Sequence, residues 1–318
     1  MSANKTSKQL NDLPLSQSRY LGHSNTPLID KTIGQYLQDI CNRYPDNTAV
    51  VMHHQQLRWS YARYLEEIDK LATGLLALGI GPGDRVGIWS PNNIEWCLTQ
   101  FATARIGAIM VCINPAYRPE ELEYALTNVG CKALITHDKF KSSDYLAMLN
   151  ELAPELSDAE PGKLVSSRLP ELRCVIRTGS DKTPGMLNFP EVCAMGSEAE
   201  YADLKGIGER LSPHEAINIQ FTSGTTGNPK GATLTHHNIL NNGMLVADAM
   251  GFGPDDKLCI PVPLYHCFGM VLGNLVCLAK GATAVFPSDA FDPTTTLKVV
   301  EQERCTGLHG VPTMFIAE

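Results

Sequence analysis

Apolar positions after Ser60 recur with the spacing of a helix. The intervals i, i+3, i+4 and i+7 place side chains on one helical face, and Gly79 suits the C-terminal end. We therefore expect an amphipathic helix that Ser60 caps. Its buried face would carry Tyr61, Tyr64, Leu65, Ile68, Leu71, Ala72 and Leu75.

Short apolar runs then alternate with helical segments. The run 85–89 precedes a helix that opens near Asn92 or Asn93, and the runs 108–113 and 132–136 follow at similar spacing. Alternation of strand and helix is typical of a parallel sheet covered by helices. The pattern therefore predicts an α/β fold.

The segment 154–215 is richer in proline, glycine and charge than its surroundings. It contains one strand candidate, at 173–177. We interpret it as a looser excursion on the surface, because such composition is typical of loops.

A second alternating set begins after residue 250. It predicts a strand near 257–262, a helix from about 269 to 279, a strand at 282–286, a helix that starts at Asp292-Pro293 and a short run at 306–309. An aspartate followed by a proline is favoured at a helix start. Two α/β layers are therefore the expected architecture.

Composition adds a constraint on ligands. Hydrophobic residues make up 43% of the 318 residues and charged residues 19%, which is enough apolar material for a packed core. Lys and Arg number 26 against 34 Asp and Glu, a net charge of −8, so we expect no general nucleic-acid binding. Any bound anion must therefore be held by a local binding motif and not by the net charge of the protein.

Cysteines and terminal segments bear on the compartment. The ten cysteines include no Cys-x-x-Cys pair and lie mostly in apolar runs, which indicates reduced core thiols. The first twenty residues hold no apolar stretch of signal-peptide length, and the most apolar stretch, 269–286, is interrupted by Asn274 and Lys280. We expect no transmembrane segment and a cytoplasmic protein, with the mitochondrial matrix as the alternative in a eukaryote.

A candidate anion-binding motif follows the β-favouring run Ile217–Thr222. The sequence continues as Ser223-Gly224-Thr225-Thr226-Gly227-Asn228-Pro229-Lys230-Gly231. Glycines let main-chain N–H groups converge on phosphate oxygens, hydroxyls add donors and Lys230 adds a cation. The loop lacks the Gly-Lys-Ser/Thr order of a Walker loop. The residues after it, GATLTH, favour a strand.

A surface turn rich in glycine and threonine is the ordinary alternative. A chance match to SGTTGxPKG at a given position has a probability on the order of 10⁻¹⁰ at ordinary residue frequencies. TSGTTGNPKG followed by ATLTHHNIL resembles the phosphate-binding signature of the adenylate-forming, or AMP-binding, enzymes. GDRVGIWSPNNIEW, INPAYRPEELEYALTNVGCKALI, PLYHCFG and GVPTMF follow the order of that family, and the chain most resembles its medium-chain acyl-CoA synthetases.

This resemblance implies a ligase that activates a fatty acid with ATP as acyl-AMP and then forms the coenzyme A thioester. ATP, Mg²⁺ and coenzyme A are the implied cofactors and co-substrates. Magnesium would bridge phosphate oxygens, and no protein ligand for it is assigned. The implied ATP/phosphate-binding residues are Thr222, Ser223, Gly224, Thr225, Thr226, Gly227 and Lys230.

The acyl side of the site is implied by other segments. A lone histidine among apolar residues, such as His266, is more often a buried core side chain. The resemblance instead puts His266 beside the acyl and adenylate pocket, which Val311 and Pro312 would also line. No carboxylate occurs in 265–268, and an ammonium group needs a buried partner, so an uncharged acyl tail is favoured over an amino acid.

The resemblance also implies a division of the chain. Residues 1–29 would be an irregular lead-in to a partial AMP-binding domain of two stacked αβ subdomains, one at about 83–250 and one at about 30–82 with 251–318. Segments that bind ribose and magnesium, and the C-terminal lid with its catalytic lysine, are not found. We therefore expect an incomplete fold that forms no acyl-CoA alone, with apolar surface uncovered at 282–286 and 306–315.

Other functions stay open at this point. An aryl-CoA ligase would use the same signature with a different acid. A phosphotransferase would form ADP where a ligase of this family forms AMP. A non-catalytic nucleotide-binding fragment would bind without turnover. Acyl chain length and oligomeric state do not follow from the sequence.

Overall fold

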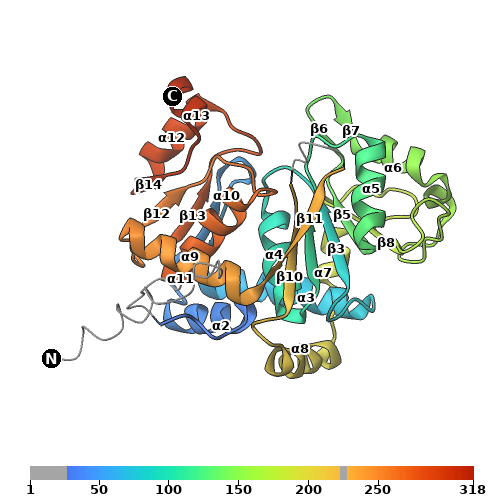
Figure 1. Cartoon of the computed structure of the whole chain (residues 1–318), viewed down its shortest axis with the longest axis horizontal. Helices are drawn as coiled ribbons and strands as arrows, with labels where there is room; N and C mark the ends of the chain where they lie inside the picture. Colours follow the sequence, from blue (N-terminus) through green and yellow to red (C-terminus); the bar gives the residue numbers. More distant parts are fainter. Residues whose placement is uncertain (1–26, 223–227) are drawn as a thin grey trace, which may run out of the picture.

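The computed structural model describes residues 27–222 and 228–318 and contains two large β-sheets (Figure 1). The first has seven strands in the order β11-β10-β4-β3-β5-β8-β9, all parallel except β11. Its strands are β3 Arg85–Trp89, β4 Ile109–Cys112, β5 Cys131–Thr136, β8 Cys174–Arg177, β9 Leu187–Asn188, β10 Ala216–Thr222 and β11 Lys230–Thr235.

The second sheet combines strands from two distant parts of the sequence. Its order is β14-β12-β13-β1-β2, in which only β2 is antiparallel to its neighbour. The strands are β1 Thr48–Met52, β2 Leu57–Ser60, β12 Lys257–Cys259, β13 Thr283–Phe286 and β14 Gly307–Leu308. The chain therefore leaves this sheet after β2 and returns to it after the seven-stranded sheet is built.

Helices between the sheets join their cores. These are α2 Ile33–Arg43, α3 Tyr61–Ala77, α4 Ile94–Ile106 and α9 His236–Met250. The predicted amphipathic helix is confirmed as α3, because Ser60 caps it and Tyr61, Ile68 and Leu75 are buried. Buried residues of α2, α3, α4 and strands of both sheets form one hydrophobic cluster. The two sheets therefore share a core.

Smaller elements complete the described chain. Around the seven-stranded sheet lie α5 Pro119–Val129, β6 Lys139–Phe140, β7 Ser143–Asp144, α6 Tyr145–Leu152, a 3₁₀ turn Pro154–Asp158, α7 Phe189–Cys193 and α8 Glu198–Arg210. The five-stranded sheet has a 3₁₀ turn His53–Gln55, α10 Cys267–Gly269, a π-helical turn Met270–Leu275, α11 Val276–Lys280, α12 Pro293–Glu303 and α13 Pro312–Ala317. The helix expected over 269–279 thus contains a π-helical turn.

The segment 154–215 is not a loose excursion, contrary to the sequence-based interpretation. Leu156, Leu164, Leu169 and Leu172 are each 1% exposed and pack in a second apolar cluster against the seven-stranded sheet. Its helix α8 also buries Leu204 and Ile207 against the rest of the chain. Isolated leucines between prolines and charges gave no periodic signal, so their burial was missed.

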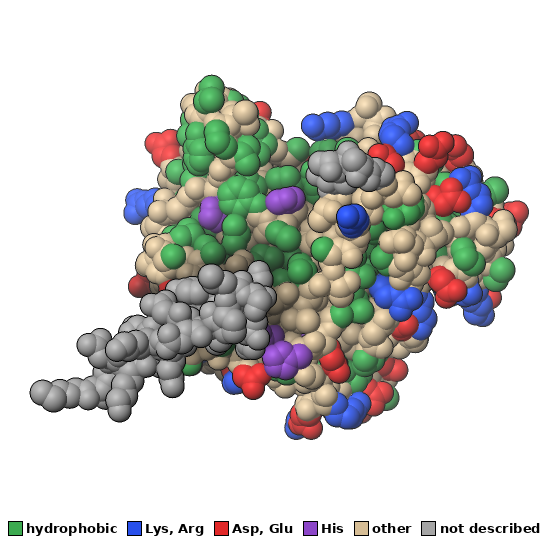
Figure 2. Space-filling view, in the orientation of Figure 1, with side chains coloured by type: hydrophobic (Ala, Val, Ile, Leu, Met, Phe, Trp, Pro, Cys, Tyr) green, Lys and Arg blue, Asp and Glu red, His purple; other side chains and the backbone are tan. Residues whose placement is uncertain are grey.

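The expectation of an uncovered face at 282–286 is also wrong. β13 lies between β12 and β1, and all four of its residues are buried. The expectation holds for the other segment, because β14 has one partner strand and Val311, Phe315 and Ile316 are exposed. Figure 2 shows apolar side chains gathered over this C-terminal end.

The cysteines and the helices bear on two further expectations, reduced core thiols and the lack of a transmembrane segment. All ten cysteines are free, and seven of them are buried. Burial raises the pKa of the Cys97 and Cys112 thiols to about 12, so both stay protonated at neutral pH. Within the two described ranges, the helices are too short or too polar to cross a membrane.

Candidate active site

The hairpin of β10 and β11 carries the predicted phosphate-binding residues (Figure 1). β10 is buried from Ile217 to Gln220 and becomes exposed at Thr222, which pairs with Lys230 at the start of β11. The Thr222 hydroxyl donates to the Lys230 carbonyl oxygen at 3.4 Å, and both side chains are exposed. The other predicted residues, Ser223, Gly224, Thr225, Thr226 and Gly227, lie outside the described residues.

Neighbouring residues support the open end of this hairpin. The Tyr124 hydroxyl, on α5, donates to the Pro229 carbonyl oxygen at 3.2 Å. Gly231 lies so close to β10 that a Cβ atom there would be 3.1 Å from Ile219 Cγ2. A side chain at 231 would crowd the Ile219 side chain, so the glycine after Lys230 fits this close approach. The hairpin end is therefore held on both sides.

The open end of the hairpin lies at the end of the sheet where several loops leave the parallel strands. β10 runs parallel to β4, β3, β5 and β8, so the carboxyl ends of all five strands share this edge. Ligands of open α/β sheets bind in the crevice outside these ends. Polar residues at or just after these strand ends include Thr222, Ser90, Asn114, His137 and Thr178.

Asn92 joins the two sheets at the same edge. It follows β3, and its side-chain amide donates to the Val262 carbonyl oxygen at 3.0 Å. Its Oδ1 accepts from the Leu264 N–H at 2.8 Å, and its backbone N–H donates to the Asp289 carbonyl oxygen at 3.0 Å. Asn92 is 3% exposed, so these bonds replace lost solvation. The crevice therefore has walls from both sheets in a fixed relation.

A cavity of about 240 Å³ opens between these walls. Its neutral lining includes prolines after β3, β4 and β12, and its charged groups are Lys141 and the exposed Asp289. Tyr145 supports one wall by donating to the Pro115 carbonyl oxygen at 2.6 Å. The lining residues are Pro91, Asn92, Asn114, Pro115, Ala116, Phe140, Lys141, Pro261, Pro263, Tyr265, Asp289, Ala290, Phe291 and Met314.

The predicted acyl-side residues lie next to this cavity in the sequence but do not line it. His266 is exposed and caps α10, where its Nδ1 accepts from the Phe268 N–H at 3.1 Å. The ordinary expectation of a buried core histidine is therefore wrong. Val311 and Pro312 are exposed at the start of α13, and the cavity is instead lined by Tyr265 and Met314.

The two acyl-side segments nevertheless meet. The Phe268 and His309 rings lie 4.9 Å apart, and His309 Nε2 is 2.8 Å from the Leu272 carbonyl oxygen. Burial lowers the pKa of His309, which keeps its ring neutral at pH 7. This contact brings the segment after β14 to the start of α10.

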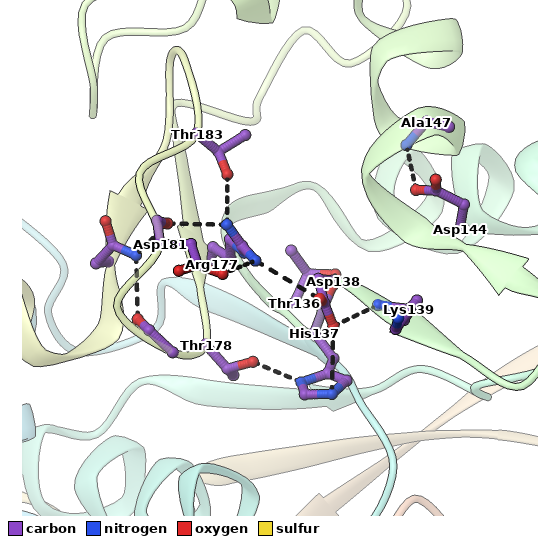
Figure 3. A network of polar contacts seen from close by, with 12 residues as sticks. Thr136, His137, Asp138, Lys139, Asp144, Ala147, Arg177, Thr178, Asp181 and Thr183 are labelled. Atoms are coloured by element: carbon purple, nitrogen blue, oxygen red, sulfur yellow. Dashed lines mark hydrogen bonds and ion pairs between the residues drawn. The ribbon is translucent and has the colours of Figure 1, made fainter.

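A polar network that the sequence did not predict orders the loops after β5 and β8 (Figure 3). Arg177 is 9% exposed, and its guanidinium contacts Asp138 at 3.5 Å and Asp181 at 3.2 Å. It also donates to the Thr183 hydroxyl at 3.0 Å. His137 Nδ1 lies 2.7 Å from the Thr178 hydroxyl. The available signal was an arginine at the end of a β-favouring run, RCVIR, which is typical of a strand edge rather than of a network.

The described residues of the crevice offer no cluster of metal ligands. Over residues 27–222 and 228–318, no three His, Cys, Asp or Glu side chains are grouped so that they could hold a metal ion. Among the described residues, side-chain donors near the hairpin end include the Thr222 hydroxyl and the Lys230 ammonium.

With this geometry in view, residues 37–318 match the family described as AMP-binding enzyme. The chain belongs to that family. Its hairpin of β10 and β11, its crevice and its second sheet are therefore parts of the fold of an adenylate-forming enzyme, as the sequence had indicated.

Several curated relatives of this AMP-binding chain share one name, medium-chain acyl-CoA ligase ACSF2, mitochondrial. The chain is 45% identical to that of Danio rerio over 304 residues, which is 95% of this chain and 50% of the relative. It is 43% identical to that of Mus musculus over 312 residues, 96% of this chain and 51% of the relative. The chain thus spans about half the length of these relatives.

Solved structures agree on the fold. The anthranilate CoA ligase AuaEII in complex with anthranoyl-AMP superposes with a TM-score of 0.77 at 21% identity, over 93% of this chain and 52% of that one. The N-terminal domain of FACL13 from Mycobacterium tuberculosis gives 0.74 at 23% identity, over 90% and 64%. At such identities the likeness concerns the fold of the AMP-binding domain alone.

The comparisons bear on the compartment as well. The cytoplasmic prediction has no support from these relatives, whose printed names include the word mitochondrial. That word describes the relatives, and the mitochondrial matrix was the stated alternative for this AMP-binding chain.

Proposed function

We propose that this protein is an acyl-CoA ligase that acts through acyl-AMP. A carboxylate oxygen of the acid attacks the α-phosphorus of ATP, the bond to pyrophosphate breaks, and acyl-AMP forms. The thiol of coenzyme A then loses its proton and attacks the acyl carbon, and AMP leaves with the oxygen that came from the acid. Membership of the AMP-binding family and 45% identity to an acyl-CoA ligase support this reaction.

The observation that carries the proposal is the exposed Thr222–Lys230 pair at the end of a buried strand. Negative charge grows on the departing pyrophosphate, and donors fixed in advance lower the barrier to its departure. We assign the β- and γ-phosphates to Thr222, to residues 223–227 and to Lys230. Mg²⁺ would offset the negative charge of the phosphate groups when bound, and we assign no side chain of the described residues as its ligand.

We assign the acyl side to the segments of His266, Val311 and Pro312, and we propose a medium-chain fatty acid as substrate. The relatives' printed names support the chain length. The carboxylate of Asp289 is exposed, so the crevice offers no buried partner for a substrate ammonium among its described lining residues. An uncharged tail therefore fits better than an amino acid.

We assign the cavity of about 240 Å³ to the thiol-bearing arm of coenzyme A. The cavity is smaller than the usual pocket for a whole drug-sized ligand, so it suits a slender group. Its lining is mostly neutral, and Lys141 supplies a cation near the mouth for phosphate groups. A neutral arm with an anionic end matches that distribution of charge.

The test of the function is ATP–pyrophosphate exchange with octanoate, made with the longest chain that the reading frame encodes. We expect octanoate-dependent exchange, followed by formation of AMP and octanoyl-CoA when coenzyme A is added. Exchange with benzoate but not with octanoate would favour an aryl-CoA ligase. Formation of ADP would contradict the proposal, and nucleotide binding without exchange would favour a non-catalytic role.

The division into subdomains and the need for further residues stay proposals. The strands at 85–235 build one sheet, and those at 48–60 with 257–308 build the other, which supports subdomains at about 83–250 and about 30–82 with 251–318. We expect residues 1–318 alone to show no exchange, since holding the ribose and the α-phosphate needs donors that we have not assigned. Limited proteolysis and an exchange assay of residues 1–318 test these two points.

A further inference from the structure

Two amide side chains are buried on the strand that leads to the phosphate loop. Asn218 is 2% and Gln220 is 7% exposed on β10, on the same face as Thr222 by the alternation of a strand. Buried strand positions usually carry apolar residues, and a buried amide stays there only with hydrogen-bond partners. The partners of these two amides differ.

Asn218 bonds within its own sheet, whereas Gln220 reaches the other half of the molecule. The Asn218 amide donates to the Met110 carbonyl oxygen at 3.1 Å and to Cys112 Sγ at 3.3 Å, both on β4. The Gln220 amide instead donates to Met270 Sδ at 3.5 Å. Met270 is fully buried, so its sulfur does not exchange this contact for water.

Met270 is the first residue of the π-helical turn, which is tied to His266. The His266 carbonyl oxygen accepts from the Gly269 and Met270 N–H groups, both at 3.0 Å. The Met270 carbonyl oxygen accepts from the Gln100 amide at 3.4 Å. π-Helical turns are costly and occur often at functional sites.

The turn also fits closely against its surroundings. A Cβ atom at Gly269 would lie 2.3 Å from the Pro263 carbonyl oxygen, so there is no room for a side chain at this position. The Gln100 side-chain oxygen accepts from the Asn274 amide at 2.8 Å, one turn further along. Met270 is therefore fixed by its backbone to His266 and by its side chain to β10.

We propose that Gln220 is a positioning residue, whose amide holds the His266–Met270 segment in a fixed place relative to Thr222. This inference rests on the proposed function, which assigns the His266–Met270 segment to the acid and Thr222 to phosphate. Gln220 stands two residues before Thr222, so one side chain links both halves of the site. Loss of the link shifts the acid relative to the α-phosphate and leaves the phosphate donors in place.

The test compares Gln220→Met with Asn218→Leu, a matched loss of a buried amide on the same face of the same strand. We expect Gln220→Met to raise the KM for octanoate in the exchange reaction about fivefold, the scale of one lost hydrogen bond, with the KM for ATP within about twofold. Asn218→Leu should lower the thermal stability without this split. Equal effects of both variants on the two KM values would overturn the proposal.

A second variant covers the case in which Gln220→Met fails to fold. Met270→Leu conserves volume and removes the sulfur acceptor, which also contacts Cys112 Sγ at 4.0 Å. It should reproduce the rise in the KM for octanoate, and the double variant should be no worse than Met270→Leu alone, because the Gln220–Met270 contact is lost in all three. Additive effects in the double variant would contradict a shared contact.

Hydrogen exchange separates failure of this inference from failure of the function. In Gln220→Met, the amides of Gly269 and Met270 should exchange at least about threefold faster than in Asn218→Leu. Unchanged protection there would overturn the link even in an active enzyme. An unsubstituted protein without any pyrophosphate exchange would instead refute the proposed function, while faster amide exchange would still establish the contact.

Discussion

The proposed phosphate side and the proposed acyl side of the site are built in different ways. The phosphate side is one hairpin, in which Thr222 and Lys230 are paired neighbours across two strands. The acyl side is assembled from separate parts of the chain, because Asn92 holds Leu264 and the Phe268 ring meets His309. The first is fixed by local pairing and the second by the way two sheets pack.

This difference has a consequence for substitutions. A change at the open end of the hairpin alters donors without disturbing a core, since Thr222 and Lys230 are exposed. A change on the acyl side alters contacts that join elements from both sheets, such as Asn92 with Val262. The predictions below use this contrast, beginning with the largest effect.

Acid should weaken the base of the hairpin first. His236 follows β11 directly and is fully buried, its Nδ1 accepts from the Ile33 N–H at 3.1 Å, and burial lowers its pKa to about 4. Below pH 6.5 the unfolded chain binds a proton that the folded chain does not. Stability should therefore fall by about 2 kcal/mol from pH 7.5 to pH 5.

Urea unfolding at these two pH values measures this loss. His236→Gln should be less stable at pH 7.5 and should lose less stability on acidification. A variant with the same pH dependence as the unsubstituted protein would show that His236 is not the responsible group.

Removal of the hairpin cation should cut adenylation. Lys230→Ala should lower the ATP–pyrophosphate exchange rate at least about tenfold, and so should Ala at both Thr225 and Thr226, because donors at a charged transition state are lost. Circular dichroism should stay unchanged for Lys230→Ala, since this side chain is exposed. Lys298→Ala, an exposed lysine on α12, is the control and should retain full exchange.

Substitution on the acyl side should change selectivity and not nucleotide affinity. His266→Ala should shift the ratio of kcat/KM between octanoate and butanoate by about fivefold, with the KM for ATP within about twofold. Steady-state exchange with both acids measures the ratio. Loss of ATP affinity with an unchanged acyl profile would place His266 on the phosphate side instead.

The smallest effect is expected at the mouth of the cavity. Lys141→Ala should raise the KM for coenzyme A about threefold, as expected for one partly solvated cation, and should leave pyrophosphate exchange unchanged. Thioester formation under saturating ATP and octanoate measures this KM. An effect on exchange alone would show that the cavity serves the first half-reaction.

The same contrast explains what the sequence could predict. The strands on either side of the glycine-rich loop, the helix capped by Ser60 and the alternating strands follow from local patterns, and all of these elements occur in the structure. Burial of Leu164 and Leu169 did not follow, because isolated leucines in a charged segment carry no period. The hydrogen-bond partners of Asn92 and Gln220 could not be predicted from local patterns either, since Val262 and Met270 lie far away in the sequence.

The central claim is that a carboxylate oxygen attacks the α-phosphorus of ATP at the hairpin end. Octanoate labelled with ¹⁸O in its carboxyl group tests this claim most directly, in a reaction with ATP and coenzyme A followed by mass spectrometry of the nucleotide. The account predicts AMP that carries one ¹⁸O atom, because AMP leaves acyl-AMP with the oxygen that came from the acid. Unlabelled AMP, or label found in inorganic phosphate beside ADP, would contradict it.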